Sequence, residues 1–333
     1  MTDPADYQKR DDELPSQSES PHAFGDQVRS ARTEFETQVA HARAEFEEAN
    51  ARIRERTGRD LILAILIGVS IGAIVLASLL FASWPFAVFA AAATVLSIFE
   101  FTRALQASGR RIDLVPQVAS GLAIVASGYL LGLRVHWVVV FVAVAFVVVW
   151  RLIAQMSAQD ARSYGDVVDD ILYSTFVQMY IPFLASLVLI LLRNENGAWW
   201  VLAFLIVVVV SDTGAYASGL TMGRHPMAPR ISPKKTWEGF AGAAFAAIVA
   251  GVLLAWLLLG LPWWTGIIFG AVVLCTATIG DLGESMVKRD LGIKDMSSWL
   301  PGHGGVLDRL DSILPSTVPA LVLYYLLTPL VMT

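Results

Sequence analysis

The stretch Leu61–Phe81 reads LILAILIGVSIGAIVLASLLF and contains no charged side chain. A helix of this length can cross the hydrocarbon core of a bilayer, which needs about 20 apolar residues. Similar runs recur to the end of the 333-residue chain, in which 56% of the residues are hydrophobic and 16% are charged. Soluble domains carry about 25% charged residues. The composition therefore predicts an all-α polytopic membrane protein.

About nine apolar segments are predicted to cross the membrane, and the connections between them differ in their content of Lys and Arg. The segments are residues 61–81, 85–105, 114–132, 135–155, 171–193, 197–218, 238–260, 263–283 and 308–331. Seventeen basic residues fall just before the first segment or in every second connection after it, whereas the other connections hold only Arg134 and Arg193. Loops rich in Lys and Arg stay in the cytoplasm. We therefore expect a cytoplasmic N-terminus and an external C-terminus.

Three regions are expected along the chain. Residues 1–25 form an acidic tail rich in Ser and Pro, a composition typical of disorder. Residues 26–59 carry apolar side chains at spacings of three and four, which predicts an amphipathic cytoplasmic helix. Self-association, docking on the protein and binding to the membrane surface all stay open for this helix. Residues 60–333 form the transmembrane catalytic domain, and we expect no cleavable signal peptide.

Acidic residues collect at the predicted cytoplasmic ends of three late spans. Asp212 lies near the end of the sixth span, Asp281 near the end of the eighth, and Asp308 and Asp311 open the ninth. A carboxylate in an apolar helix costs about 3 kcal/mol or more, so four together indicate a site. Oxygen ligands suit Mg²⁺, whereas zinc prefers His and Cys, and Cys275 is the chain's single cysteine. Salt bridges to neighbouring bases are the structural alternative.

Two basic segments lie on the same predicted side of the membrane. Arg230–Gly239 reads RISPKKTWEG, a turn broken by proline, and Lys288–Asp295 reads KRDLGIKD. Opposite a carboxylate cluster, these segments indicate a site for a polyanion that arrives with metal, such as a nucleoside triphosphate or a phospholipid. Simple binding of anionic lipid headgroups is the alternative for the lysine-rich turn.

Glycines in the run PGHGG (residues 301–305) precede the two aspartates of the ninth span. Gly304 and Gly305 allow backbone N–H groups to approach phosphate oxygens. His303 has three open roles, which are contact with phosphate, acid/base chemistry and fixing the loop.

The segment SMVKRDLGIKDMSSWLPGHGGVLDRLDS, residues 285–312, closely resembles the signature of the phosphatidate cytidylyltransferases, also called CDP-diacylglycerol synthases. SDTGAYASG and ISPKKTWEG resemble segments upstream of that signature, and the likeness is specific over residues 205–315. The resemblance implies that CTP and phosphatidic acid give CDP-diacylglycerol and pyrophosphate. It also implies Mg²⁺ at two metal sites, held by Asp281 and Asp308 with Asp311 nearby. A monovalent cation such as K⁺ is compatible with one site.

The resulting mechanism is an in-line attack of the lipid phosphate on the α-phosphorus of CTP. We expect catalytic roles for Asp281, Asp308, Asp311, Lys235, Arg309 and His303. We expect substrate binding by Asp212, Ser232, Lys234, Lys235, Ser285, Lys288, Arg289, Lys294, Gly304 and Gly305. CTP would come from the cytosol and phosphatidic acid from the cytoplasmic leaflet, so the active site should lie at the cytoplasmic face. The resemblance implies a bacterial-type cytoplasmic (inner) membrane.

Other readings stay open at this point. The nearest is a related CTP-dependent enzyme that acts on a prenyl or other lipid phosphate or alcohol. A transporter would place its charges near the membrane midplane instead. A scaffold role for residues 26–59 and a homodimer are both compatible with catalysis, and no nucleic-acid partner is expected.

Overall fold

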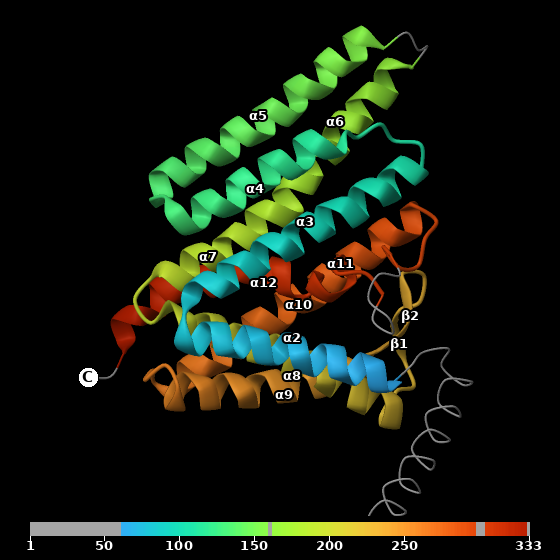
Figure 1. The fold of residues 1–333 in the computed structure, drawn as a ribbon. Coiled ribbons are helices and arrows are strands. Elements are labelled where there is room, and N and C mark those ends of the chain that lie inside the picture. Colours follow the sequence, from blue (N-terminus) through green and yellow to red (C-terminus); the bar gives the residue numbers. More distant parts are fainter. Residues whose placement is uncertain (1–60, 159–161, 298–303, 332–333) are drawn as a thin grey trace, which may run out of the picture. The chain divides into compact units, whose positions relative to one another are not determined.

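The computed structural model describes residues 61–158, 162–297 and 304–331, with side chains from residue 68 onward (Figure 1). The predicted tail and amphipathic helix, residues 1–59, lie outside these ranges, as does His303. The helices are α2 (Leu61–Phe81), α3 (Ser83–Ala107), α4 (Leu114–Leu130), α5 (Leu133–Ser157), α6 (Tyr164–Gln178), α7 (Leu184–Arg193), α8 (Gly197–Met222), α9 (Trp237–Leu257), α10 (Trp263–Asp290), α11 (Leu307–Leu310) and α12 (Ile313–Leu327). A π-helical turn, Met179–Phe183, joins α6 to α7, and a 3₁₀ turn, Thr328–Leu330, follows α12.

Seven helices of the described part are long and apolar enough to cross a membrane. They are Ser83–Ala107, Leu133–Ser157, Tyr164–Arg193, Gly197–Met222, Trp237–Leu257, Trp263–Asp290 and Leu307–Leu330. The first and third predicted spans correspond to shorter apolar helices, Gly68–Phe81 and Leu114–Leu130. The helical, multi-pass class is confirmed, and each of the nine predicted segments contains a helix.

The helix of the fifth predicted span begins earlier than residue 171. Ser163 caps it, because the hydroxyl of Ser163 accepts the Asp166 N–H at 3.2 Å and the Asp166 carboxylate accepts the Ser163 N–H at 3.2 Å. This reciprocal cap satisfies N–H groups that would otherwise lack partners at the helix start. Pro182 lies in the π-helical turn, as expected for a residue that lacks an N–H and interrupts the regular ladder.

The predicted lysine-rich turn is part of a short β-hairpin. Strand β1 (Pro226–Ala228) pairs antiparallel with β2 (Ser232–Thr236) between α8 and α9. Thr236 then caps α9, since its hydroxyl accepts the Gly239 N–H at 3.1 Å. The hairpin is the one sheet in the described ranges. Its second strand carries Lys234 and Lys235 at the end of the helix bundle where α8 stops and α9 starts.

Helices α8, α9 and α10 approach one another through small residues. A Cβ atom added to Gly251 of α9 would lie 2.4 Å from the carbonyl oxygen of Gly266 in α10. A Cβ added to Gly214 of α8 would lie 2.8 Å from the Cβ of Ala246 in α9. Close contact between small residues is the usual way in which membrane helices pack. It holds the polar ends of α8 and α10 in one cluster.

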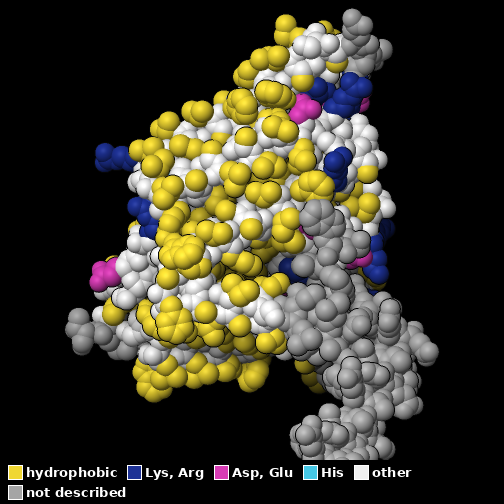
Figure 2. All heavy atoms as spheres, in the orientation of Figure 1, with side chains coloured by type: hydrophobic (Ala, Val, Ile, Leu, Met, Phe, Trp, Pro, Cys, Tyr) yellow, Lys and Arg dark blue, Asp and Glu magenta, His cyan; other side chains and the backbone are white. Residues whose placement is uncertain are grey.

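Charged side chains gather at the ends of the helices. The α3–α4 and α5–α6 connections, the β1–β2 hairpin and the connection from α10 to α11 all lie at the same end, on the right in Figure 1. Figure 2 shows hydrophobic side chains covering the middle of the visible face, with most Lys, Arg, Asp and Glu near its edges. This distribution is expected for helices surrounded by lipid.

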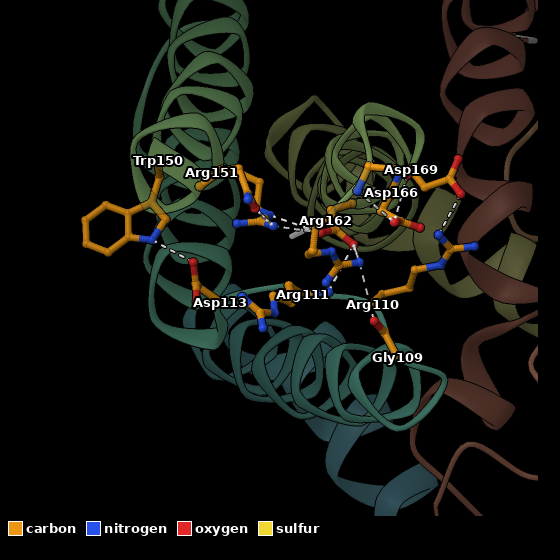
Figure 3. Close-up of polar contacts among 12 residues, drawn as sticks. Gly109, Arg110, Arg111, Asp113, Trp150, Arg151, Arg162, Asp166 and Asp169 are labelled. Atoms are coloured by element: carbon orange, nitrogen blue, oxygen red, sulfur yellow. Dashed lines mark hydrogen bonds and ion pairs between the residues drawn. The ribbon is translucent and has the colours of Figure 1, made fainter. Parts of the chain in front are cut away.

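A buried ionic cluster at this end joins α5 and α6 to the α3–α4 connection. Asp170 of α6 is fully buried and accepts hydrogen bonds from Arg151 at 2.8 Å, Arg162 at 3.2 Å and the Arg111 backbone N–H at 3.0 Å. Figure 3 shows the side chains of Arg151 and Arg162 converging beside α6. Buried charges of this kind require pairing, so the cluster fixes the α3–α4 connection against α5 and α6.

Candidate active site

A polar cavity of about 360 Å³ opens where α8, β2, α10 and α11 meet. Its charged lining consists of Asp212 from α8, Lys234 and Lys235 from β2, Asp281 from α10, and Asp308, Arg309 and Asp311 around α11. The structure therefore brings together all four carboxylates that the sequence placed at one depth, and it adds both hairpin lysines.

The hairpin is held in place from its flanks. The Glu238 carboxylate, in the first turn of α9, accepts the backbone N–H groups of Arg224 at 3.1 Å and His225 at 3.2 Å. The His225 ring contacts the same carboxylate at 2.5 Å. These contacts join the chain entering β1 to the start of α9. They therefore hold the backbone of the hairpin, and with it Lys234 and Lys235, beside the cavity.

Asp281 is paired with a base. Lys235 forms an ion pair with its Oδ2 atom, and the Ser285 hydroxyl donates to Oδ1 at 3.5 Å. Both partners of the ion pair are partly exposed, at 26% for Lys235 and 29% for Asp281. Since neither partner is fully buried, solvent weakens the ion pair, and this contact can open at small cost.

Asp308 is more deeply held. Its Oδ1 atom accepts from Lys288 Nζ at 3.0 Å, and its Oδ2 atom accepts the N–H groups of Gly305 at 2.8 Å and Met296 at 3.1 Å. Lys288 also lies 3.5 Å from Glu284, one turn earlier on α10. Asp308 thus orders the chain on both sides of residues 298–303 as well as facing the cavity.

Some of the remaining predicted residues line the polar cavity, and others lie outside its lining. Asp311 accepts the Ser312 N–H at 2.7 Å and lines the cavity with Arg309 and Asp212. The cavity lining does not include six residues that the sequence analysis assigned to substrate binding, namely Ser232, Ser285, Arg289, Lys294, Gly304 and Gly305. Lys288 also lies outside the lining and contacts Asp308 and Glu284 instead.

The acidic cluster fits Mg²⁺ by the chemistry of its ligands, although lysines now occupy two of them. Within the described ranges, the side chains of His, Cys, Asp and Glu form no group of three arranged to hold a metal ion. Asp281 and Asp308 are engaged by Lys235 and Lys288. All four carboxylates nevertheless offer hard oxygen ligands around one cavity, as Mg²⁺ requires, and metal binding would have to displace these lysines.

A second cavity, of about 380 Å³, lies on another face of α10. Its walls are mainly apolar, and they include Phe101, Phe176, Tyr180, Ile279, Met296 and Val318. Glu284 is the one charged residue of this lining, and its carboxylate oxygens have no hydrogen-bond donor among the described residues. Gly280 and Gly283 of α10 complete the wall.

Sequence reasoning missed two buried glutamates that contact this region. Glu284 follows Asp281 by three positions and precedes Lys288 by four, so helical spacing alone connects it to both. Glu100 lies in α3 and contacts residues around α11. The signal that could have found Glu100 is an acid inside the predicted span 85–105, where Arg103 is the one other charged residue.

Comparison with known sequences identifies the class. Residues 62–328 match the cytidylyltransferase family, and the chain belongs to that family. Among similar proteins, the phosphatidate cytidylyltransferase of Mycobacterium bovis is 41% identical over 284 residues, which cover 82% of this chain and 90% of the relative. That of Mycobacterium leprae is 38% identical over 287 residues, covering 82% and 90%. That of Haemophilus influenzae is 39% identical over 155 residues, covering 44% and 54%. The resemblance seen in the signature segment is confirmed.

Proposed function

We propose that the protein is a phosphatidate cytidylyltransferase that converts CTP and phosphatidic acid into CDP-diacylglycerol and pyrophosphate. The observation that carries this proposal is the polar cavity, where four carboxylates and two lysines from separate elements meet. A cavity with both signs of charge suits a triphosphate that binds with a metal ion. The similarity to phosphatidate cytidylyltransferases over most of the chain supports the choice of substrates.

The reaction forms one phosphorus–oxygen bond and breaks another. An oxygen of the lipid phosphate attacks the α-phosphorus of CTP, the bond to the bridging oxygen of the β-phosphate breaks, and pyrophosphate leaves with that electron pair. A phosphate oxyanion is already nucleophilic, so the site needs positioning and charge neutralisation rather than a strong base. Lys234, Lys235 and Arg309 line the cavity and are our candidates for contacts with phosphate oxygens.

The cofactor in this proposal is Mg²⁺, which Asp281, Asp308 and Asp311 would hold. When bound, Mg²⁺ neutralises charge on the phosphates and orients them. Two metal sites, one of them compatible with K⁺, remain our expectation. A triphosphate entering the cavity competes with Asp281 for Lys235, which is only partly buried in its ion pair. The polyanion would therefore draw this lysine from the carboxylate that the metal needs.

The apolar cavity beside α10 is the part of the structure that suits the acyl chains of the lipid substrate. We propose that an acyl chain of phosphatidic acid occupies the apolar cavity, whose lining residue Ile279 is 67% exposed. Lys288 lies between Glu284 of that cavity and Asp308 of the polar one. A lipid phosphate near Lys288 would be within reach of both cavities.

The proposed orientation follows from the basic connections. The polar cavity lies at the helix ends that also carry the arginine-rich α3–α4 and α5–α6 connections (Figure 1). The positive-inside rule assigns this end to the cytoplasm, with an external C-terminus. CTP then enters from the cytosol and phosphatidic acid from the cytoplasmic leaflet. A homodimer stays a prediction.

The decisive experiment offers purified protein radiolabelled CTP with phosphatidic acid or, separately, with a prenyl phosphate. We expect Mg²⁺-dependent label in CDP-diacylglycerol. Label in the prenyl product alone would replace the proposed substrate by a prenyl lipid and keep the nucleotidyl transfer.

A further inference from the structure

Glu100 is a buried carboxylate in α3, remote in sequence from the acidic cluster, and its side chain faces the start of α11. The residue is 2% exposed. Its Oε1 atom accepts from the Ser297 hydroxyl at 2.5 Å and from the Val306 N–H at 3.0 Å. Its Oε2 atom accepts the Leu307 N–H at 2.9 Å. Glu100 does not line the polar cavity.

These contacts bracket the segment 298–303 from both sides. Ser297 precedes the segment, while Val306 and Leu307 follow it. Asp308 brackets the same segment through the N–H groups of Met296 and Gly305. The two carboxylates thus divide the donors on each side of the segment. Before it, Asp308 accepts from Met296 and Glu100 from Ser297. After it, Asp308 accepts from Gly305, and Glu100 accepts from Val306 and Leu307.

The carboxylate of Glu100 lies close to the backbone at Gly305. A Cβ atom added there would lie 2.7 Å from Glu100 Oε2 and 3.1 Å from Asp308 Oδ2. Any side chain would force one of the carboxylates to move. The close approach of the backbone therefore explains the glycine at this position, because only glycine leaves space for both anions.

We propose that Glu100 is a positioning residue for the catalytic aspartates: it clasps the start of α11 so that Asp308, Arg309 and Asp311 face the polar cavity. The catalytic part of this inference rests on the proposed function. The clasp itself rests on three hydrogen bonds to one carboxylate, and bonds to an ionised group are the strong kind. Catalytic groups must be held closely, since a displacement of about 1 Å can lower a rate about 100-fold.

The substitution Glu100→Gln tests the clasp with almost no change in volume. A carboxamide has one acceptor oxygen, so one of the three donors would face an NH₂ group instead. Glu195→Gln is the matched control, because Glu195 is exposed in the α7–α8 connection and the Tyr324 hydroxyl donates to its backbone carbonyl rather than to its side chain.

The first measurement is independent of activity. Hydrogen exchange of the amides of Val306 and Leu307 is followed by mass spectrometry in the full-length protein in lipid nanodiscs. We expect exchange at least fivefold faster in Glu100→Gln than in wild type, with Glu195→Gln unchanged. A smaller increase in Glu100→Gln would overturn the clasp, whether or not the wild-type protein transfers cytidylyl groups.

The second measurement separates positioning from folding. We expect Glu100→Gln to lower kcat per folded molecule at least tenfold, with KM for CTP within threefold of wild type. A loss of activity that only follows the folded fraction would overturn the positioning role. If Glu100→Gln does not fold, Ser297→Ala removes a single donor, and a fall in kcat of less than twofold would then refute the proposal.

Positioning also predicts the behaviour of the double variant. Since Ser297 acts through Glu100, adding Ser297→Ala to Glu100→Gln should lower kcat less than twofold further. Fully additive losses would show that the two residues act separately. Activity of the wild-type protein, measured in the same assay, reports on the proposed function by itself.

Discussion

Asp281→Asn should abolish most activity while leaving the protein folded. The substitution replaces one carboxylate oxygen by an NH₂ group at the position where Lys235 pairs. Both partners are more than a quarter exposed, so loss of their ion pair should lower the free energy of unfolding by less than about 1 kcal/mol. Loss of a metal ligand should instead lower kcat about 100-fold or more. That ratio corresponds to about 2.7 kcal/mol of activation free energy.

The assay combines turnover with thermal unfolding. Incorporation of radiolabelled CTP into CDP-diacylglycerol is measured at saturating phosphatidic acid over a range of Mg²⁺ concentrations. Asp290→Asn is the control, since Asp290 lies exposed at the end of the same helix. If Asp281→Asn kept turnover within threefold of wild type, the carboxylate would not be a metal ligand and the proposed site would be wrong. A large fall in the unfolding temperature would refute the assignment of this pair as weakly stabilising.

Three further predictions concern the rest of the molecule. Asp170→Asn leaves Arg151 buried without its counter-ion, so the free energy of unfolding should fall by about 3–5 kcal/mol; thermal unfolding checks this, and an unchanged midpoint would contradict it. Gly283→Leu adds an apolar side chain at the wall of the apolar cavity, where an added Cβ meets no atom within 4 Å. We expect KM for phosphatidic acid to rise at least fivefold with KM for CTP unaltered, and equal changes in both would argue against an acyl chain in this cavity. Gly251→Val would collide with Gly266 and should cost about 1–3 kcal/mol, again measured by unfolding; a midpoint equal to that of wild type would show that α9 and α10 can separate freely.

The sequence predicted the acidic cluster because the relevant information is local. Apolar runs give the helices, and the position of Asp212, Asp281 or Asp308 along its run gives a depth in the membrane. Residues at equal depth on packed helices can meet, and here they line one cavity. The signature residues around Asp308 also lie close to one another in the chain.

The partners of these residues could not be predicted in the same way. Glu100 contacts residues about 200 positions later, and no periodicity links an acid in α3 to the start of α11. The Asp170 cluster likewise depends on the path of the α3–α4 connection. The start of α6 was readable from the Ser163–Asp166 cap, but the polar residues of its first turns hid it from a search for apolar runs.

The lysine on Asp281 has a consequence for the order in which ligands arrive. Without nucleotide, Lys235 neutralises a carboxylate that a divalent ion needs, so the empty site should attract free cations only weakly. If the proposed function holds, a triphosphate would recruit that lysine and expose the carboxylate, which would make nucleotide and metal binding mutually reinforcing. Reciprocity then requires that Mg²⁺ strengthen CTP binding by the same factor by which CTP strengthens Mg²⁺ binding. The ion pair between Lys235 and Asp281 would thus couple the two binding events, so that CTP and Mg²⁺ bind together more tightly than either binds alone.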